Sequence, residues 1–265
     1  MTARVLIPTG FGLNCEDETA RAFRLVGAEV DLVHLTDLFS SSHARRIPDY
    51  QVLVLGGGFA YGDHVAGGFV LATRIRAHLA EDLGAFLAGG GRVLGICNGC
   101  QTLVRLGLLP GPEAGAADFV PRAAFTDNER LGYRDAWVRL APESGSRSIW
   151  TRGLGVLEVP ARHGEGRFVA GSEEALRRLE ANGQVALRYV DEGLRPTERW
   201  PENPNGSRGG VAGICDASGR ILGLMPHPEA FLYPFCHPDW PRRREELEGR
   251  EPPSLALFRN GVAGL

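Results

Sequence analysis

The amino-acid sequence predicts an α/β fold: a doubly wound, mostly parallel sheet flanked by helices, with a C-terminal half rich in β-strands. In the first half, short aliphatic runs alternate with segments of helical spacing, which is the order of strand–helix–strand units. Two of these runs, 52–55 and 93–96, are nearly all apolar, as expected for parallel strands buried on both faces. No break in composition divides the 265 residues, so we expect a single domain over 1–265.

Each element of the first half follows from its residues. Strands are predicted at residues 5–8, 30–34, 52–55 and 93–96. Helices are predicted at residues 16–26, where Ala20, Phe23 and Val26 share one face, and at residues 70–87. A further helix is expected to begin directly after Cys97. Because ligands of such sheets bind at the carboxyl ends of the strands, the residues that follow each strand are candidate site positions.

The second half is predicted to contain more strands with shorter connections. Its apolar runs lie at residues 137–140, 156–159, 185–189, 211–214 and 221–224. The last two runs are predicted to pair as a hairpin through a turn that contains Gly219. Helices are expected at 172–182, which opens on Ser172 with two acidic residues, and at 254–262. The Pro-containing segments 196–210 and 234–253 are predicted to be loops.

The composition argues against several classes of function. The formal net charge is -3 and no basic stripe is present, so we expect no nucleic-acid partner. No apolar run approaches the about 20 residues that span a bilayer, so we expect no membrane partner. Five sparse cysteines without a signal peptide indicate a reducing cytoplasm. All 29 basic residues are arginine, which excludes a P-loop lysine, and we expect neither a metal nor another cofactor in this chain.

Cys97 is the most informative position, because it ends an apolar strand and precedes a helix. A sulfur at a helix N-terminus is stabilised as thiolate, the nucleophilic form, and Gly99 permits a sharp turn there. A buried packing cysteine has the same local sequence. Cys97 and Cys100 also form a C-x-x-C, which suits a redox pair or half of a zinc site. The residues around Cys97 leave these interpretations open.

A base for this nucleophile is available in the segment 225–229. In an extended backbone, His227 and Glu229 project to the same side, and the prolines beside them stiffen the segment. His227 would take the thiol proton and Glu229 would hold the imidazole tautomer. A redox pair would not use these two residues, and no second C-x-x-C or H-x-x-H follows to complete a zinc site with the C-x-x-C. We therefore favour a catalytic set of Cys97, His227 and Glu229.

Acyl transfer also needs hydrogen-bond donors for an oxyanion. Gly57 and Gly58 follow the predicted strand 52–55 and allow the backbone to approach a substrate, and the N–H of Asn98 offers a second donor. A run of glycines also suits a plain loop or a phosphate cradle. No dinucleotide-binding or P-loop motif accompanies it.

Taken together, these residues resemble a known family, the class I glutamine amidotransferases, and within it the glutaminase components of phosphoribosylformylglycinamidine synthase. The resemblance covers nearly the whole chain. Its general motifs are the nucleophile segment 95–101 and the base segment 224–229. The motifs more specific to the purine branch lie at residues 14–18, 58–63, 163–168, 189–191 and 203–207. The resemblance implies a flavodoxin-like class I amidotransferase fold.

The resemblance also implies a reaction and its partners. Glutamine would be hydrolysed through a glutamyl thioester on Cys97, and the ammonia would pass to a synthetase subunit. That subunit would bind ATP and Mg²⁺ and convert formylglycinamide ribonucleotide to formylglycinamidine ribonucleotide in purine biosynthesis. A small third subunit is implied as well. Gly57 or Gly58 with Asn98 would form the oxyanion hole, Phe59 and Gln101 would contact the substrate glutamine, and His163 and Glu165 would lie near the site or the partner surface.

The sequence departs from the family at two positions of the glycine loop. Gly56 stands where proline is usual, and Ala60 replaces a serine. Because glycine at position 56 increases the freedom of the loop, we predict a low resting glutaminase rate that rises when the partner docks. Two other functions remain open: a class I amidotransferase of another pathway, and a non-catalytic, flavodoxin-like interaction module.

Overall fold

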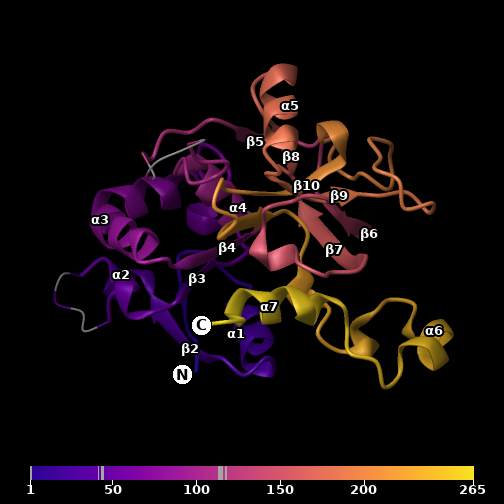
Figure 1. Cartoon of the computed structure of the whole chain (residues 1–265), viewed down its shortest axis with the longest axis horizontal. Helices are drawn as coiled ribbons and strands as arrows, with labels where there is room; N and C mark the ends of the chain where they lie inside the picture. The colour runs from indigo at the N-terminus through magenta and orange to yellow at the C-terminus, as the bar shows by residue number, and fades with distance from the viewer. Residues whose placement is uncertain (1, 41, 43–44, 113–115, 117) are drawn as a thin grey trace.

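The structure is a computed structural model that describes residues 2–40, 42, 45–112, 116 and 118–265. Within these residues, nine strands form one sheet in the order β2-β1-β3-β4-β11-β10-β9-β6-β7. Figure 1 shows helices on both sides of this sheet. The predicted α/β class is therefore confirmed.

One half of the sheet is parallel. β1 pairs with β2 and β3, and β4 pairs with β3 and β11, all in parallel. Aliphatic side chains dominate β3 and β4, because helices cover both faces of these strands. The strands of this half are β1 (Arg4–Thr9), β2 (Glu29–His34), β3 (Val52–Leu55), β4 (Arg92–Ile96) and β11 (Ile221–Leu224).

The other half is antiparallel, from β11 through β10, β9 and β6 to β7. The sheet is thus mixed, and the expectation of a mostly parallel sheet holds only for the first half. The predicted hairpin is confirmed, since β10 and β11 pair with Ile214 opposite Gly223. A hairpin joins only antiparallel strands, and the second half has no helix long enough to make a parallel crossover at this point. Its strands are β6 (Arg134–Pro142), β7 (Leu157–His163), β9 (Val185–Tyr189) and β10 (Val211–Cys215).

The helices form two layers on the parallel half. The connection from β1 to β2 and the one from β3 to β4 run in opposite directions along the sheet, and right-handed crossovers therefore place their helices on opposite faces. On one face, α1 (Glu16–Leu25) packs against α7 (Ser254–Val262), with the rings of Phe23 and Phe258 5.2 Å apart. On the other face, α3 (Phe69–Ala88) packs against α4 (Asn98–Arg105). A short helix, α2 (Leu35–Leu38), follows β2.

Several local elements differ from the sequence expectations. The segment 234–253, expected to be a loop, contains α6 (Trp240–Leu247), which has Pro241 in its first turn and carries the Arg243–Glu246 ion pair at helical spacing. A two-stranded sheet of β5 (Ala124–Thr126) and β8 (Arg167–Val169) was not predicted, because three residues are too few to show a period. The predicted helix after Ser172 is confirmed as α5 (Glu173–Ala181). No described helix combines the length and apolar character needed to cross a membrane.

Candidate active site

Cys97 occupies the corner between β4 and α4, at the carboxyl end of a parallel strand. Its backbone has φ 50° and ψ -108°, a left-handed conformation that costs free energy for a residue with a side chain and that is found at nucleophile elbows. Gly99 makes the corner possible, because a Cβ at this position would lie 1.8 Å from the carbonyl oxygen of Leu55. The fold therefore holds Cys97 at the first turn of α4, where we predicted it.

The two cysteines of the C-x-x-C have different surroundings. Cys97 is 6% exposed, and its thiol donates to the carbonyl oxygen of Arg162 at 3.5 Å. Cys100 is fully buried against β11, where a Cβ at Gly223 would lie 2.6 Å from its sulfur. Burial raises the pKa of the Cys100 thiol well above its ordinary value. Both cysteines are free, and the position of Cys100 is that of a packing residue.

His227 and Glu229 follow β11 and form a buried pair. His227 Nδ1 lies 2.6 Å from Glu229 Oε1, and the two side chains are almost inaccessible. The backbone N–H of His227 donates to the carbonyl of Pro160, which ties the segment to β7. Burial by itself lowers the pKa of His227, but the negative charge of Glu229, together with the neighbouring sulfurs of Cys97 and Cys15, outweighs it and raises this pKa well above its ordinary value.

Neighbouring strands bring the nucleophile and this pair together. Ile96 of β4 lies opposite Leu224 of β11, and the N–H of Cys97 donates to the Leu224 carbonyl at 2.8 Å. Because Nδ1 of His227 faces Glu229, Nε2 is the nitrogen that remains for the thiol. Nε2 is buried and has no hydrogen-bond partner in the described part of the chain. A bond between a nucleophile and its base often tightens only when substrate binds.

The glycine loop is tethered to the segment that follows β1. The N–H of Asn14 donates to the Gly57 carbonyl at 3.2 Å, and the N–H of Phe59 donates to the Gly12 carbonyl at 2.8 Å. In a trans peptide the C=O and N–H point in opposite directions, so the N–H of Gly58 points away from Asn14. The N–H of Asn98, in the first turn of α4, has no helical acceptor. Of the predicted oxyanion donors Gly57, Gly58 and Asn98, the N–H groups of Gly58 and Asn98 are thus free of these backbone bonds, and the role of all three as donors stays a prediction.

The predicted substrate contacts differ in how accessible they are. The side-chain amide of Gln101 accepts from Asn98 Nδ2 at 3.0 Å and donates to the Glu165 carbonyl at 2.7 Å, so both of its ends are engaged. Asn98 Nδ2 also donates to Asp63 at 2.6 Å. Phe59, in contrast, is 48% exposed. Direct contact of Gln101 or Phe59 with glutamine remains a prediction.

Sequence reasoning did not identify Asn128, which organises the loop above the nucleophile. Its Oδ1 accepts from the Gly166 N–H at 3.0 Å and contacts His163 Nδ1 at 3.1 Å, and its Nδ2 donates to the His163 carbonyl at 2.9 Å. Because Oδ1 is an acceptor, Nδ1 of His163 carries the proton, and burial lowers the pKa of His163 to about 4. The same loop contains Glu165, whose carboxylate accepts from the Gly67 N–H. The motif 163–168 signalled this loop, but no local signal marked Asn128.

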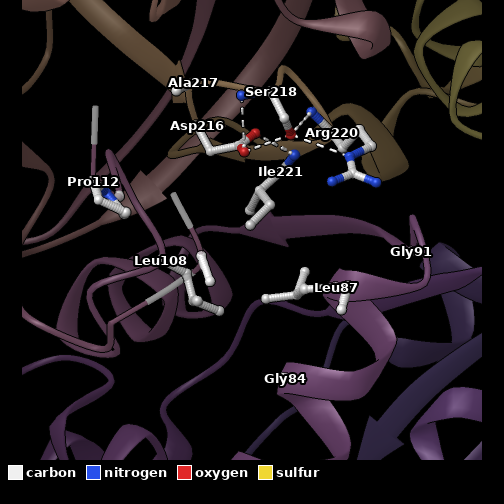
Figure 2. Close-up of a pocket in the computed structure, with 13 residues that line it drawn as sticks. Gly84, Leu87, Gly91, Leu108, Pro112, Asp216, Ala217, Ser218, Arg220 and Ile221 are labelled. Atoms are coloured by element: carbon white, nitrogen blue, oxygen red, sulfur yellow. Dashed lines mark hydrogen bonds between the residues drawn. The ribbon is translucent and has the colours of Figure 1, made fainter. Parts of the chain in front are cut away.

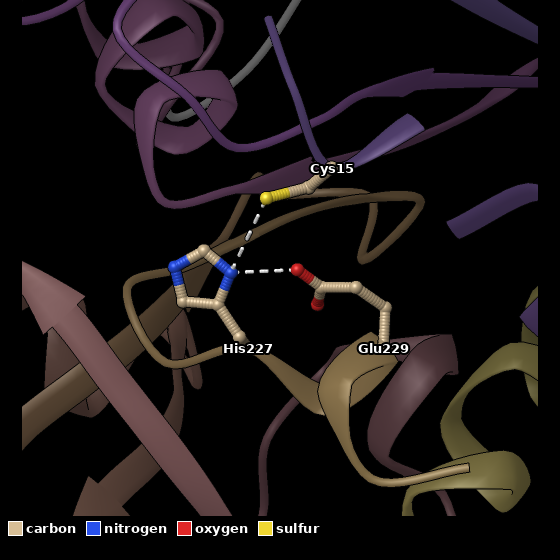
Figure 3. A group of neighbouring side chains, drawn as sticks. All are labelled: Cys15, His227 and Glu229. Atoms are coloured by element: carbon tan, nitrogen blue, oxygen red, sulfur yellow. Dashed lines mark hydrogen bonds and ion pairs between the residues drawn. The ribbon is translucent and has the colours of Figure 1, made fainter. Parts of the chain in front are cut away.

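Cys15 is the second residue that sequence reasoning missed. Its sulfur lies 4.0 Å from His227 Nδ1, on the side where Glu229 also approaches, as Figure 3 shows. Cys15 directly follows the loop after β1, and β1 is the neighbour of β3 in the sheet. The strand order therefore explains the position, because carboxyl ends of parallel strands meet at one edge.

A separate hollow of about 420 Å³ lies at the other end of β4. Figure 2 shows it between the α3 residues Gly84 and Leu87 and the hairpin residues Asp216 and Ile221. Its lining includes Gly91, directly before β4, whereas Cys97 follows the last residue of that strand. This hollow is therefore not part of the candidate active site.

The fold and the grouping of a cysteine, a histidine and a glutamate at one sheet edge are those of a class I glutamine amidotransferase. A family model described as a CobB/CobQ-like glutamine amidotransferase domain matches residues 2–263. The chain belongs to this family, and within it to the phosphoribosylformylglycinamidine synthase subunits called PurQ.

The individual similarities extend over the full chain. The PurQ subunit of Methanococcus maripaludis is 38% identical over 99% of this chain and 98% of its own length. That of Corynebacterium jeikeium is 39% identical over 100% of this chain and 99% of its own. Among solved structures, a chain of PurLQS from Thermotoga maritima has a TM-score of 0.71 at 26% identity, covering 99% of this chain and 98% of that chain.

Proposed function

We propose that this chain is the glutaminase subunit of a phosphoribosylformylglycinamidine synthase. It hydrolyses glutamine to glutamate and ammonia and supplies the ammonia to a synthetase subunit, which forms formylglycinamidine ribonucleotide in purine biosynthesis. The observation that carries the proposal is the buried His227–Glu229 pair, 2.6 Å apart, at the strand end next to Cys97. The PurQ relatives, similar over nearly their whole lengths, support the pathway.

In the first half of the reaction, His227 Nε2 takes the proton of the Cys97 thiol, and the thiolate attacks the side-chain amide carbon of glutamine. The N–H groups of Gly58 and Asn98 stabilise the resulting oxyanion. His227 returns its proton to the amide nitrogen, the C–N bond breaks, and ammonia leaves a glutamyl thioester on Cys97. Glu229 keeps the proton on Nδ1 and stabilises the imidazolium that forms.

In the second half, His227 accepts a proton from water while the hydroxide attacks the thioester. The tetrahedral oxyanion forms at the same donors, the C–S bond breaks, and glutamate is released with the Cys97 thiol restored. Phe59 and Gln101 line the glutamine side of the pocket in this proposal. The chain acts as a single domain over 1–265 in the cytoplasm and needs no cofactor of its own.

The partner assignments complete the proposal. The synthetase subunit binds ATP and Mg²⁺ and consumes the ammonia, and a small third subunit completes the complex. This division agrees with the absence of lysine from the chain, since ATP sites commonly use one. No nucleic acid or membrane takes part.

The chemical part of the proposal is tested by labelling with a chloroketone analogue of glutamine, followed by mass spectrometry. We expect one adduct, on Cys97, that is abolished in Cys97→Ser and slowed in His227→Ala. Cys236→Ser, which removes another partly buried cysteine, serves as the matched control and should label normally. An unlabelled wild-type chain would overturn the proposed chemistry.

The pathway is tested with the synthetase subunit. We expect the two chains to co-purify in the presence of glutamine, and glutamine to support formylglycinamidine ribonucleotide synthesis only when Cys97 is intact. Free ammonia should bypass the Cys97→Ser defect. We also expect the resting glutaminase rate to rise on docking, as predicted from Gly56. Equal turnover with and without the synthetase would contradict that prediction and favour an amidotransferase of another pathway.

A further inference from the structure

Three side chains with metal-binding donors converge on one side of the His227 ring. The sulfur of Cys15, Nδ1 of His227 and a carboxylate oxygen of Glu229 all lie within 4.8 Å of one another. Figure 3 shows the thiol and the carboxylate approaching the same nitrogen from different directions. Thiolate, imidazole and carboxylate are the ligand types of Zn²⁺ in proteins. No metal site was predicted from the sequence, and Cys15 is 212 residues from His227 in the chain, so no short metal-binding motif contains them both.

The separations are close to those of a tetrahedral zinc site. With metal–ligand bonds of about 2.0–2.3 Å, ligand atoms around tetrahedral zinc lie about 3.3–3.6 Å apart. The structure has 4.0 Å between Cys15 Sγ and His227 Nδ1, and 2.6 Å between Nδ1 and Glu229 Oε1. The sulfur and the carboxylate oxygen lie within 4.8 Å of one another, so shifts of up to about 1 Å at the three ligand atoms would convert these separations into those of bound metal. Three protein ligands leave a fourth position for water.

Two further observations favour a ligand at this place. Glu229 is 2% exposed, and its second carboxylate oxygen, Oε2, has no hydrogen-bond partner within the described residues. A buried carboxylate oxygen without a partner is costly, and a cation would relieve that cost. Cys15 is only partly buried, and its thiol makes a long contact of 3.4 Å with Asn14, so it is both reachable and weakly held. A metal ion can therefore enter from the Cys15 side.

We propose that Cys15, His227 and Glu229 form an inhibitory site for a thiophilic divalent cation, with Zn²⁺ the best match. Binding forms one bond each from the metal to Cys15 Sγ, His227 Nδ1 and a Glu229 oxygen. The thiol proton of Cys15 is released to solvent. A ring protonated on both nitrogens also releases its Nδ1 proton and keeps the one on Nε2, whereas in a neutral ring the Nδ1 proton moves through solvent to Nε2. No oxidant or reductant takes part.

The consequence for catalysis follows from the imidazole tautomer and rests on the proposed glutaminase function. A neutral imidazole that gives its Nδ1 lone pair to a metal carries its proton on Nε2. Nε2 is the nitrogen that faces the nucleophile, so the ring can no longer accept the proton of Cys97. The metal also takes Glu229 away from the role of orienting His227. Occupation of this site therefore stops glutamine hydrolysis without touching Cys97.

Metal binding is tested first, independently of activity, with Co²⁺ as a spectroscopic substitute for Zn²⁺ on the full-length chain. A Cys15 ligand predicts a thiolate-to-cobalt charge-transfer band in the near ultraviolet that Zn²⁺ abolishes. The band should be lost in Cys15→Ser and kept in Cys97→Ser and in the control Cys236→Ser. Loss of the band in Cys97→Ser with retention in Cys15→Ser would place the metal on the nucleophile and overturn the inference, as would the absence of any band.

Inhibition is tested next in the complex with the synthetase. We expect micromolar-range titration of Zn²⁺ to inhibit glutamine-dependent synthesis but not ammonia-dependent synthesis, and a chelator to restore activity. Cys15→Ser should need at least about tenfold more Zn²⁺ for the same inhibition, with Cys236→Ser unchanged. Equal sensitivity of Cys15→Ser and wild type would refute the site. An inactive wild-type glutaminase would instead refute the proposed function, because the cobalt band reports binding without turnover.

Discussion

The parallel and antiparallel halves of the sheet contribute to the candidate site in different ways. The parallel half supplies the groups that react or carry charge: Cys97 after β4, the glycine loop after β3, and His227 with Glu229 after β11. The antiparallel half supplies backbone acceptors, namely the carbonyls of Pro160 and Arg162 on β7. Its remaining contribution is the loop that Asn128 holds in place.

This difference has a topological cause. All parallel strands end at the same edge of a sheet, so residues from distant parts of the chain meet there without special connections. Antiparallel strands end at alternate edges, and a loop between them reaches the site only if other contacts direct it. We therefore expect substitutions of the reacting side chains in the parallel half to change the chemistry with little change in stability. Those in the antiparallel half should change stability and substrate affinity.

Glu229→Gln gives the largest expected effect of these changes and tests the parallel half. Glutamine keeps the shape and can accept from His227 Nδ1, so the chain should stay folded, but the imidazolium loses its counter-charge. We expect kcat for glutamine hydrolysis to fall by about 10²–10⁴, by analogy with other nucleophile–base–acid sets. Glu246→Gln on the surface of α6 is the control. A normal kcat in Glu229→Gln would remove this carboxylate from the mechanism.

Asn128→Ala tests the antiparallel half. It removes the partner of His163 Nδ1 and of the Gly166 N–H, both buried, and should lower the free energy of unfolding by about 3 kcal/mol. KM for glutamine should rise more than kcat falls, because the displaced loop supports the pocket and not the reacting atoms. Asn128→Asp keeps the acceptor oxygen, so its free energy of unfolding should fall less than that of Asn128→Ala. Denaturant unfolding measures the change in stability, and steady-state kinetics measures KM and kcat. A large fall in kcat at unchanged stability would contradict the proposed division of roles between the two halves of the sheet.

The buried His163 should make stability depend on pH in the acid range. Its pKa is lowered from 6.5 to about 4 by burial, so between these values the unfolded state binds more protons than the folded state. This contribution to stability is complete above pH 6.5 and is lost as the pH falls toward 4, up to about 3 kcal/mol. The slope of unfolding free energy against pH in that interval should be smaller in His163→Gln. Identical slopes would show that His163 titrates normally.

Gly57→Ala has the smallest expected effect and sharpens the comparison within the parallel half. Its Cβ would lie 2.8 Å from His227 Cε1 and 3.1 Å from the sulfur of Cys15, so the imidazole must shift. Such overpacking costs about 1–3 kcal/mol, and we expect kcat to fall by about 10–10². Gly155→Ala, where a Cβ meets open space, is the control. If both variants kept full activity, the close approach of the glycine loop to His227 would not matter for catalysis.

The parts of the site that could be predicted are those whose local sequence is sufficient. Cys97, His227 and the glycine loop each follow directly on a short apolar run, so strand-end positions were visible in the sequence. The proximity of Cys15 to His227 could not be predicted, because it depends on β1 lying next to β3. Asn128 lies two residues after a three-residue strand, and its bonds reach residues 132–166, which no periodicity connects.

The mixed character of the sheet shows the same limit. The apolar runs of β4 and β10 are similar in sequence, and neither run indicates whether its neighbouring strand is parallel or antiparallel. The helix α6 was missed for another reason, since the prolines around it suggested a loop and its arginine–glutamate pairs form only once it is helical.

The sequence alone determined the α/β class, the corner at Cys97 and the pairing of His227 with Glu229. These properties depend on backbone propensity and on spacing within a few residues. Only the tertiary structure decided the antiparallel direction of the second half and the hydrogen bond from Asn14 to Gly57. It also decided the hydrogen bonds by which Asn128 holds its loop, and the short distance between Cys15 and His227. Those features depend on strand order and on contacts between segments up to about two hundred residues apart. Bringing such distant segments together costs chain entropy, and only the packing of the whole fold offsets that cost.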